Sequence, residues 1–229
     1  EGQEISVDVR NGVSDLTVKS NTMTGPGSGV DSRGVHLYAG DQSQINLDSN
    51  TIKNFKTGFY SGTSAGDVKV SGNTFESNTA GIGGIEEGTT VDVDSNTFTD
   101  NSEAVGVGAG TVNMDDQTGL AKADVGGYTA YFSSIQQAVD SAEPDTTVEV
   151  QEGTYEETVT VETNGVTITG QDTPTVRFAP DSQTGLPTFR LEADGVTLEG
   201  FNVERVGVDR GEESYTLPVQ GIRISGSNA

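Results

Sequence analysis

Four segments of the amino-acid sequence repeat one pattern of apolar and polar residues. They are "LTVKSNTM" at Leu16, "INLDSNTI" at Ile45, "VKVSGNTF" at Val68 and "VDVDSNTF" at Val91, and they begin 29, 23 and 23 residues apart. In each segment the first, third and last residues are apolar, and the residues between them are polar. Repeats of about 20 to 50 residues are typical of proteins that stack one structural unit on the next.

Each repeat predicts a short strand followed by a turn. Apolar and polar residues alternate over the first three positions, as in a strand with one buried side. The Ser/Gly-Asn-Thr sequence that follows is typical of a turn. A chain that returns to the same place every 23 residues would stack each strand on its predecessor at a spacing of about 4.8 Å. The repeats therefore predict an all-β protein built from stacked coils.

An asparagine occupies the same turn position in every repeat. Asparagines at one turn of successive coils can form an amide ladder, in which each side chain hydrogen-bonds its neighbours. Alternatively, asparagine is present because it tolerates the left-handed backbone conformation that a turn can require. Both interpretations are structural, and they concern Asn21, Asn50, Asn73 and Asn96.

The segment "YFSSIQQAVDSAEPDTTVEVQEGTYEETVTV", residues 131–161, predicts a short amphipathic helix followed by strands. Ile135, Ala138, Val139 and Ala142 fall on one helical face. Ser133 or Ser134 can cap the start of this helix. The later segments "NGVTITG" and "DGVTLEGFNVERV" have the alternation of further strands.

Together these segments resemble the pectin-lyase-like superfamily of right-handed parallel β-helices. In many such domains an amphipathic helix caps the beginning of the β-helix. The resemblance implies an all-β fold, a right-handed parallel β-helix with one short capping helix in mid-chain. It covers nearly the whole chain as a fold and implies no particular activity.

The position of this helix predicts the domain organisation, because it follows four complete repeats instead of preceding them. Residues 1–113 are expected to form β-helix coils that lack an N-terminal cap. Residues 114–127 are expected to form a linker, since they mix glycine with scattered charge. Residues 128–229 are expected to hold the capping helix and the first coils of a second β-helix, which is open at its C-terminal end.

The two open ends predict contact between copies of the chain. An uncapped β-helix end exposes apolar side chains and unpaired backbone groups, which favours stacking by another chain. If one copy continued into the next, the strand of Ile222 and Ile224 would precede that of Leu16 and Val18 by one 23-residue coil. The segment around Ile5, Val7 and Val9 would supply a further strand of that coil. Such copies would form either a head-to-tail filament, a homopolymer, or the units of a tandem-repeat protein.

Charge narrows the partners that we expect. Thirty-five acidic and twelve basic residues give a formal net charge of -23, which argues against a nucleic acid partner. So acidic a composition resembles that of proteins from extreme halophiles, including haloarchaeal secreted or surface proteins. Molar salt reduces the Debye length to about 3 Å and removes most of the self-repulsion.

Other features of composition exclude further classes of site. The chain has no cysteine, so neither disulfides nor a thiol active site are available. No apolar run is long enough to span a membrane. We expect an extracellular or cell-surface protein.

A search for catalytic residues identifies no complete set. Asp92 and Asp94 alternate outward on one strand, as a calcium site or an acid pair would need, but in so acidic a chain we interpret them as a solvated face. Asp115 and Asp116 lie in the predicted linker. His36, the only histidine, lies near Arg33 in the insertion "GPGSGVDSRGVHLYAG", where either a small site or an ordinary surface loop is expected.

One tripeptide resembles an enzyme motif. "QDT" at Gln171 resembles a catalytic motif of pectin methylesterases, but it comes about one coil after the capping helix and the other motifs of that family are missing. The sequence therefore predicts no catalytic residues and no required cofactor, with calcium left open. Our leading hypothesis is a structural or adhesive surface protein that assembles head to tail. The alternative is a β-helix that binds or cleaves a polysaccharide.

Overall fold

The computed structural model describes residues 4–27, 29–39, 42–62, 65–178, 187–205 and 221–225. The chain divides into two compact units. The first comprises Glu1–Thr118 and Tyr128–Ser133, and the second comprises Gly119–Gly127 and Ser134–Ala229. Each unit is described separately below.

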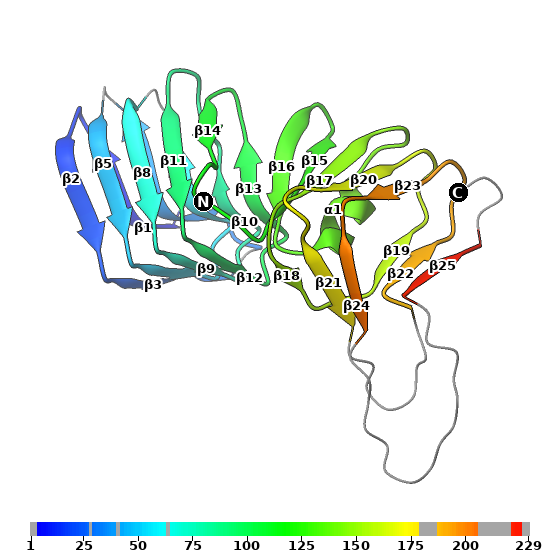
Figure 1. Ribbon diagram of the computed structural model, residues 1–229. Coiled ribbons are helices and arrows are strands. Elements are labelled where there is room, and N and C mark those ends of the chain that lie inside the picture. The colour runs from blue at the N-terminus through cyan, green and yellow to red at the C-terminus, as the bar shows by residue number, and fades with distance from the viewer. Residues whose placement is uncertain are drawn as a thin grey trace, which may run out of the picture. The chain divides into compact units, whose positions relative to one another are not determined.

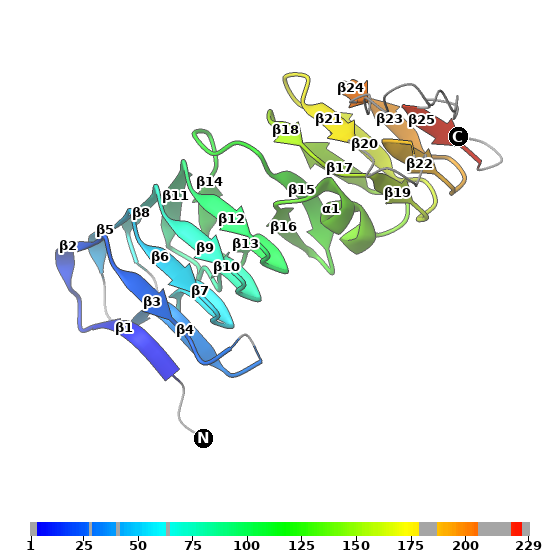
Figure 2. The same ribbon diagram turned by 90° about the horizontal axis from the view of Figure 1, so that it is seen from below.

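In the described part of the first unit, the chain winds through three stacked sheets (Figure 1, Figure 2). The first sheet contains β1 (Glu4–Arg10), β4 (Ser32–Ala39), β7 (Thr57–Ser61), β10 (Ala80–Gly83), β13 (Glu103–Val107) and β16 (Tyr128–Phe132). The second contains β2 (Ser14–Lys19), β5 (Ser43–Asp48), β8 (Asp67–Ser71), β11 (Thr90–Asp94) and β14 (Thr111–Asn113). The third contains β3 (Thr22–Thr24), β6 (Thr51–Lys53), β9 (Thr74–Glu76) and β12 (Thr97–Thr99).

Successive coils of this unit pair in parallel and in register. Val68 of β8 lies beside Val91 of β11, and Phe75 of β9 lies beside Phe98 of β12. The sequence repeat thus becomes a spatial repeat, with like residues stacked on like. The stack ends differently at β16, which pairs antiparallel with β13.

The core of the first unit consists of the apolar positions of the repeats. Val68, Val70, Phe75 and their equivalents are buried, and the rings of Phe75 and Phe98 stack 5.3 Å apart. Gly81 lets the first sheet approach these rings closely. A Cβ atom at this position would lie 2.7 Å from the Ala104 carbonyl oxygen and 2.9 Å from the Phe98 ring.

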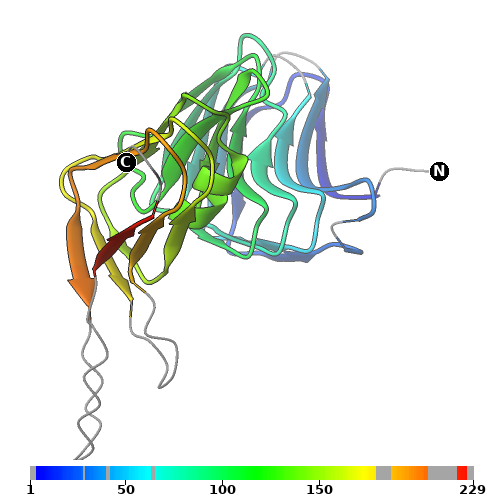
Figure 3. The ribbon, with the colours of Figure 1, turned by 90° about the vertical axis from the view of Figure 1, so that its right-hand side faces the viewer.

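The second unit repeats the three-sheet arrangement with shorter strands (Figure 3). Among its described residues, one group of paired strands is β15 (Ala121–Val125), β17 (Thr147–Val150), β20 (Thr167–Gly170) and β23 (Thr197–Glu199). A second group is β18 (Thr154–Tyr155), β21 (Thr175–Phe178) and β24 (Asn202–Arg205). A third group is β19 (Val159–Val161), β22 (Phe189–Leu191) and β25 (Ile222–Ile224), and only β15 runs antiparallel to its neighbour β17.

Helix α1 (Ile135–Ser141) packs on this second unit through its apolar face. Ile135, Ala138 and Val139 are fully buried, as the sequence predicted. Ser134 caps the helix, its hydroxyl accepting from the Gln137 amide. The structure adds a second cap, because the Glu157 carboxylate accepts from the backbone amides of Ile135 and Gln136 at 2.8 and 2.9 Å. An acidic group at the helix N-terminus also interacts favourably with the helix dipole.

The predicted fold class is confirmed: the protein is all-β, with stacked parallel strands and one short helix in mid-chain. The structure differs from the expectation over residues 114–127, because β15 forms within this predicted linker and pairs with β17. Ala121 and Ala123 supply its buried side. Alanine is a weak strand former, so this segment carried little strand signal in the sequence.

Candidate functional site

The outward side of the first sheet of the first unit, called the outer face below, carries the chemically most varied side chains. Val35 and Leu37 of β4 point into the core, so His36 and Tyr38 lie on the outward side. Parallel register aligns the outward residues into two rows that cross the strands. One row contains Asp8, His36, Tyr60 and Gly83, and the other contains Ile5, Arg33, Thr57, Ala80 and Glu103.

One end of the outer face holds a compact polar and aromatic group, called the His36 cluster. The His36 ring is 1% exposed and lies edge-on to the rings of Tyr38 and Tyr60, with both centroid distances 5.3 Å. The Arg33 guanidinium lies 3.7 Å from the centre of the Tyr60 ring, and that of Arg10 lies 4.4 Å from the centre of the Tyr38 ring. Both contacts have the geometry of cation–π interactions.

The polar atoms of the His36 cluster are connected to one another. Arg33 Nη1 lies 3.2 Å from His36 Nε2. His36 Nδ1 lies 3.5 Å from Asp8 Oδ1. The other oxygen of Asp8 accepts from Arg10 Nε at 2.5 Å. Burial, and next the charge of Arg33, lower the pKa of His36 below its ordinary value of 6.5, while Asp8 opposes this shift.

Beyond the His36 cluster, both rows shrink to small residues and leave a groove of about 380 Å³. Thr57, Ala80 and Gly83 form part of its floor. A Cβ atom built on Gly83 would meet nothing closer than 3.4 Å, so a side chain at this position would project into the groove. At neighbouring Gly84, by contrast, a Cβ atom would collide with the Tyr60 ring at 2.0 Å. Tyr60 therefore lies directly beside the groove.

Tyr128 and Glu103 form the other end of the groove. The Tyr128 hydroxyl donates to Glu103 Oε1 at 2.6 Å, and 42% of Tyr128 is exposed. This hydrogen bond, followed by burial and by the negative charge of Glu103, raises the pKa of Tyr128 to about 12. Tyr128 therefore presents a neutral phenol and an accessible ring at ordinary pH.

The sequence did not predict this face as a site, and it misplaced His36. The insertion around His36 was expected to be a loop with surface exposure, but Ser32–Ala39 is a strand and His36 is buried. The tyrosines were not singled out at all. A signal was present: Tyr60 and Gly83 follow His36 by 24 and 47 residues, about one and two coil lengths.

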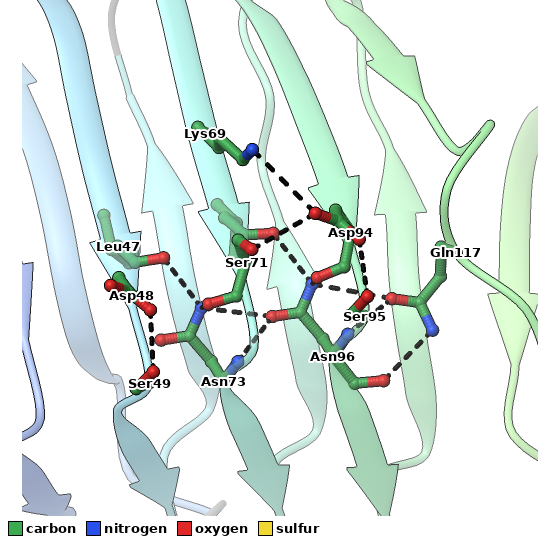
Figure 4. A network of polar contacts seen from close by, with 11 residues as sticks. Leu47, Asp48, Ser49, Lys69, Ser71, Asn73, Asp94, Ser95, Asn96 and Gln117 are labelled. Carbon is green, nitrogen blue, oxygen red and sulfur yellow. Dashed lines mark hydrogen bonds and ion pairs between the residues drawn. The ribbon is translucent and has the colours of Figure 1, made fainter.

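The four predicted ladder asparagines do lie at one turn of successive coils (Figure 4). Asn21 Nδ2 donates to Asn50 Oδ1, Asn50 to Asn73 and Asn73 to Asn96, at 2.9 to 3.1 Å. The sequence analysis did not identify Gln117, whose Oε1 accepts from the Asn96 backbone amide at 2.8 Å. A second, shorter ladder joins Asn78 Nδ2 to Asn101 Oδ1 at 3.0 Å. Both ladders are structural.

The residues predicted to join copies of the chain lie at two places. Val9 and Val18 are buried, whereas Ile5, Val7 and Leu16 are partly exposed. Ile222 and Ile224 of β25 are 46% and 57% exposed. β25 pairs in parallel with β22, with Ile222 beside Phe189 and Ile224 beside Leu191. These positions form no common site within one chain.

The acidic residues that the sequence analysis considered for calcium line a small hollow of about 130 Å³. Asp92 and Asp94 project from β11, and Lys69 Nζ lies 3.8 Å from Asp94 Oδ2. Asp115 and Asp116 line the same hollow. Among the described residues, no group of three or more acidic or histidine side chains has the arrangement of a metal site.

Comparisons with known proteins complete the description of the site. The family model described as "Right handed beta helix region" matches residues 2–121, slightly more than half of the chain. This region contains the ladders and the outer face except for β16. No curated protein and no solved structure gives a significant match. Within the described residues, no helix has the length and apolarity needed to cross a membrane.

Proposed function

The chain belongs to the right-handed β-helix family, and from that premise we propose that it is an extracellular or cell-surface protein that binds a polysaccharide along the outer face. The groove floored by Thr57, Ala80 and Gly83 carries the proposal, since it is open, long enough for a sugar unit and bordered by Tyr60 and Tyr128. Its volume of about 380 Å³ lies within the ordinary range for ligand sites.

The side chains around the groove suit a sugar. Tyrosine rings can pack against the apolar face of a pyranose ring and still offer a hydroxyl for hydrogen bonding. Tyr38 and Tyr128 are 50% and 42% exposed. Arg33, Glu103 and Thr57 add hydrogen-bond donors and acceptors along the same face. A polymer lying across the strands would meet these groups in succession.

The positions of the carboxylates favour binding over cleavage. Asp8 lies on β1 and Glu103 on β13, and four strand spacings separate these strands. At about 4.8 Å per spacing, the two carboxyl groups are at least about 19 Å apart. Glycosidases hold their two catalytic carboxyl groups about 5 to 9.5 Å apart. These two acids therefore cannot act as such a pair.

Filling the groove tests this function. We expect Gly83→Leu to weaken binding to a polysaccharide, found by screening a glycan panel, by about tenfold or more. Gly66→Leu is the matched control, because a Cβ atom there meets nothing closer than 3.6 Å and Gly66 lies outside the groove. Isothermal titration calorimetry would measure both variants. Absence of any ligand in a broad panel, or equal affinity for both variants, would refute the proposal.

A second function, head-to-tail association of copies, is favoured by the exposure of Ile222 and Ile224. Two isoleucines on one short strand leave an apolar edge, and burying one such side chain contributes about 1.5 to 3 kcal/mol. We propose that the partner is a second copy, which contributes Leu16 and Val18 and the neighbouring strand of Ile5, Val7 and Val9. The resulting assembly would be a filament, because a head-to-tail contact that does not close into a ring continues indefinitely.

Analytical ultracentrifugation across a range of concentrations tests this association. The wild-type chain is expected to form larger species as its concentration rises, and Ile222→Asp with Ile224→Asp to remain monomeric. Val30→Asp is the control, since Val30 is 43% exposed and lies elsewhere. A wild-type protein that stays monomeric at high concentration, in dilute buffer and in molar salt, would exclude this second function.

A further inference from the structure

His36 is a buried titratable residue that the proposed function does not itself use. Three strands supply the groups that face it: Asp8 and Arg10 from β1, Arg33 and Tyr38 from its own strand β4, and Tyr60 from β7. Two of these groups are cations, one is an anion, and the other two are tyrosine rings. A proton on His36 would therefore change the electrostatic balance of the cluster.

The contact with Arg33 fixes the state of the imidazole ring. A guanidinium can only donate hydrogen bonds, so Nε2 of His36, 3.2 Å from Arg33 Nη1, must be the acceptor. The ring is then neutral, with its single proton on Nδ1. That atom makes no hydrogen bond among the described residues and lies 3.5 Å from Asp8 Oδ1. The arrangement is consistent with a pKa that burial and Arg33 lower.

Protonation would reverse the interaction between these two residues. The added proton occupies Nε2, which removes the acceptor that Arg33 uses, and it places an imidazolium beside a guanidinium. Like charges in a buried setting repel strongly. The Arg33 guanidinium, 3.7 Å above the Tyr60 ring, is the partner with room to move, because its strand neighbour His36 is enclosed by two tyrosine rings.

We propose that His36 is a positioning residue that holds Arg33 over Tyr60 only while its ring is neutral, so that acidification releases Arg33 from the border of the groove. As regulation of ligand binding, this inference rests on the proposed function, and binding is expected to weaken as the pH falls. Its structural part, the coupling between the His36 proton and the position of Arg33, can be measured without any ligand.

Proton NMR tests the coupling directly, because the chain has one histidine and its imidazole signals are unambiguous. In the wild type we expect His36 to titrate below its ordinary pKa of 6.5. The side-chain protons of Arg33 are expected to lose the upfield shift that an aromatic ring causes when His36 takes up its proton. Arg33→Gln should raise the pKa of His36, and Arg177→Gln, which removes an arginine paired with Glu156, should leave it unchanged.

Stability provides a second ligand-free measurement. Because the pKa of His36 is lower in the folded chain than in the unfolded chain, the unfolded chain binds the proton first as the pH falls. This contribution to stability is therefore complete above about pH 6.5 and is lost as the pH falls through the folded-state pKa. His36→Gln keeps a neutral acceptor for Arg33 and should lack this component of the pH dependence.

The binding arm uses the polysaccharide identified by the glycan panel. Wild-type affinity should fall on the order of tenfold between about pH 7 and pH 5, as expected for loss of one hydrogen bond from a charged donor. His36→Gln should bind with nearly constant affinity over this range. An unchanged His36 pKa in Arg33→Gln, or an equally steep loss of affinity in His36→Gln, would overturn the inference. If no glycan binds, the proposed function fails, and the two NMR titrations alone decide the coupling.

Discussion

The two units build coils from similar short strands, but only the first unit repeats a constant coil length. From β5 onward in that unit, Val68 pairs with Val91 and Phe75 with Phe98, each 23 residues further along the chain. In the second unit, Thr147 pairs with Thr167 and Thr167 with Thr197, which are steps of 20 and 30 residues. Coil length is therefore regular in one unit and variable in the other.

This difference determines how each unit satisfies the polar groups of its turns. In the first unit, Asn73 and Asn96 fall at the same place in successive coils, so their buried amides can hydrogen-bond each other. In the second unit, the turn residue Asn164 accepts a single bond from the Asp194 amide, and it is exposed. That unit relies instead on helix α1 and its Glu157 cap. Constant period permits buried polar ladders, and variable period requires local caps.

Asn73→Ala should cause the largest loss of stability in this comparison. Asn73 Oδ1 accepts from the backbone and side-chain amides of Asn50, both at 2.9 Å, and Asn73 Nδ2 donates to the Leu47 carbonyl. Its removal leaves at least two buried groups without partners, each costing about 1 to 3 kcal/mol. We expect the free energy of unfolding of the first unit to fall by about 3 kcal/mol in urea titrations.

The matched substitution for Asn73→Ala is Asn164→Ala in the second unit. Hydrogen exchange followed by mass spectrometry would report the two units separately, because it resolves protection along the chain. If Asn73→Ala cost no more than Asn164→Ala, the ladder would not be what distinguishes the units.

The sequence predicted the regular unit better than the variable one, for a physical reason. A constant period repeats the same apolar and turn residues, so Leu16, Ile45, Val68 and Val91 identify the stack directly. Strand β15 escaped prediction because its buried side consists of alanines. The shorter Asn78–Asn101 ladder was missed although each asparagine follows a ladder residue, Asn73 or Asn96, by five positions.

The outer face could not be predicted because it depends on register between strands. His36 lies in a glycine-rich insertion that resembles a loop, and its burial comes from Tyr38 beside it and Tyr60 on the next strand. The groove depends on Gly83 falling in the row of Tyr60. Such rows are readable only once the length of each coil is known, and the coil containing His36 departs from the 23-residue period.

Glu157→Ala is expected to have an intermediate effect and would test the local cap. The Glu157 carboxylate accepts from two backbone amides and from the Ser134 hydroxyl at the start of α1. Loss of such a cap costs about 1 to 2 kcal/mol. Glu156→Ala is the control, because Glu156 forms an exposed ion pair with Arg177 and such pairs contribute little. Equal protection of α1 in the two variants, measured by hydrogen exchange, would contradict a capping role.

Asn164→Ala should have the smallest effect, about 0.5 kcal/mol. Its side chain accepts one hydrogen bond, from the Asp194 amide at 2.9 Å, at an exposed turn. Water can replace that bond when the side chain is removed, so little desolvation cost remains. Hydrogen exchange of the Asp194 amide should accelerate while the strands on either side keep their protection. A loss as large as that of Asn73→Ala would mean that variable coils also depend on stacked turn amides, and the distinction between the two units would then have to be sought in their loops.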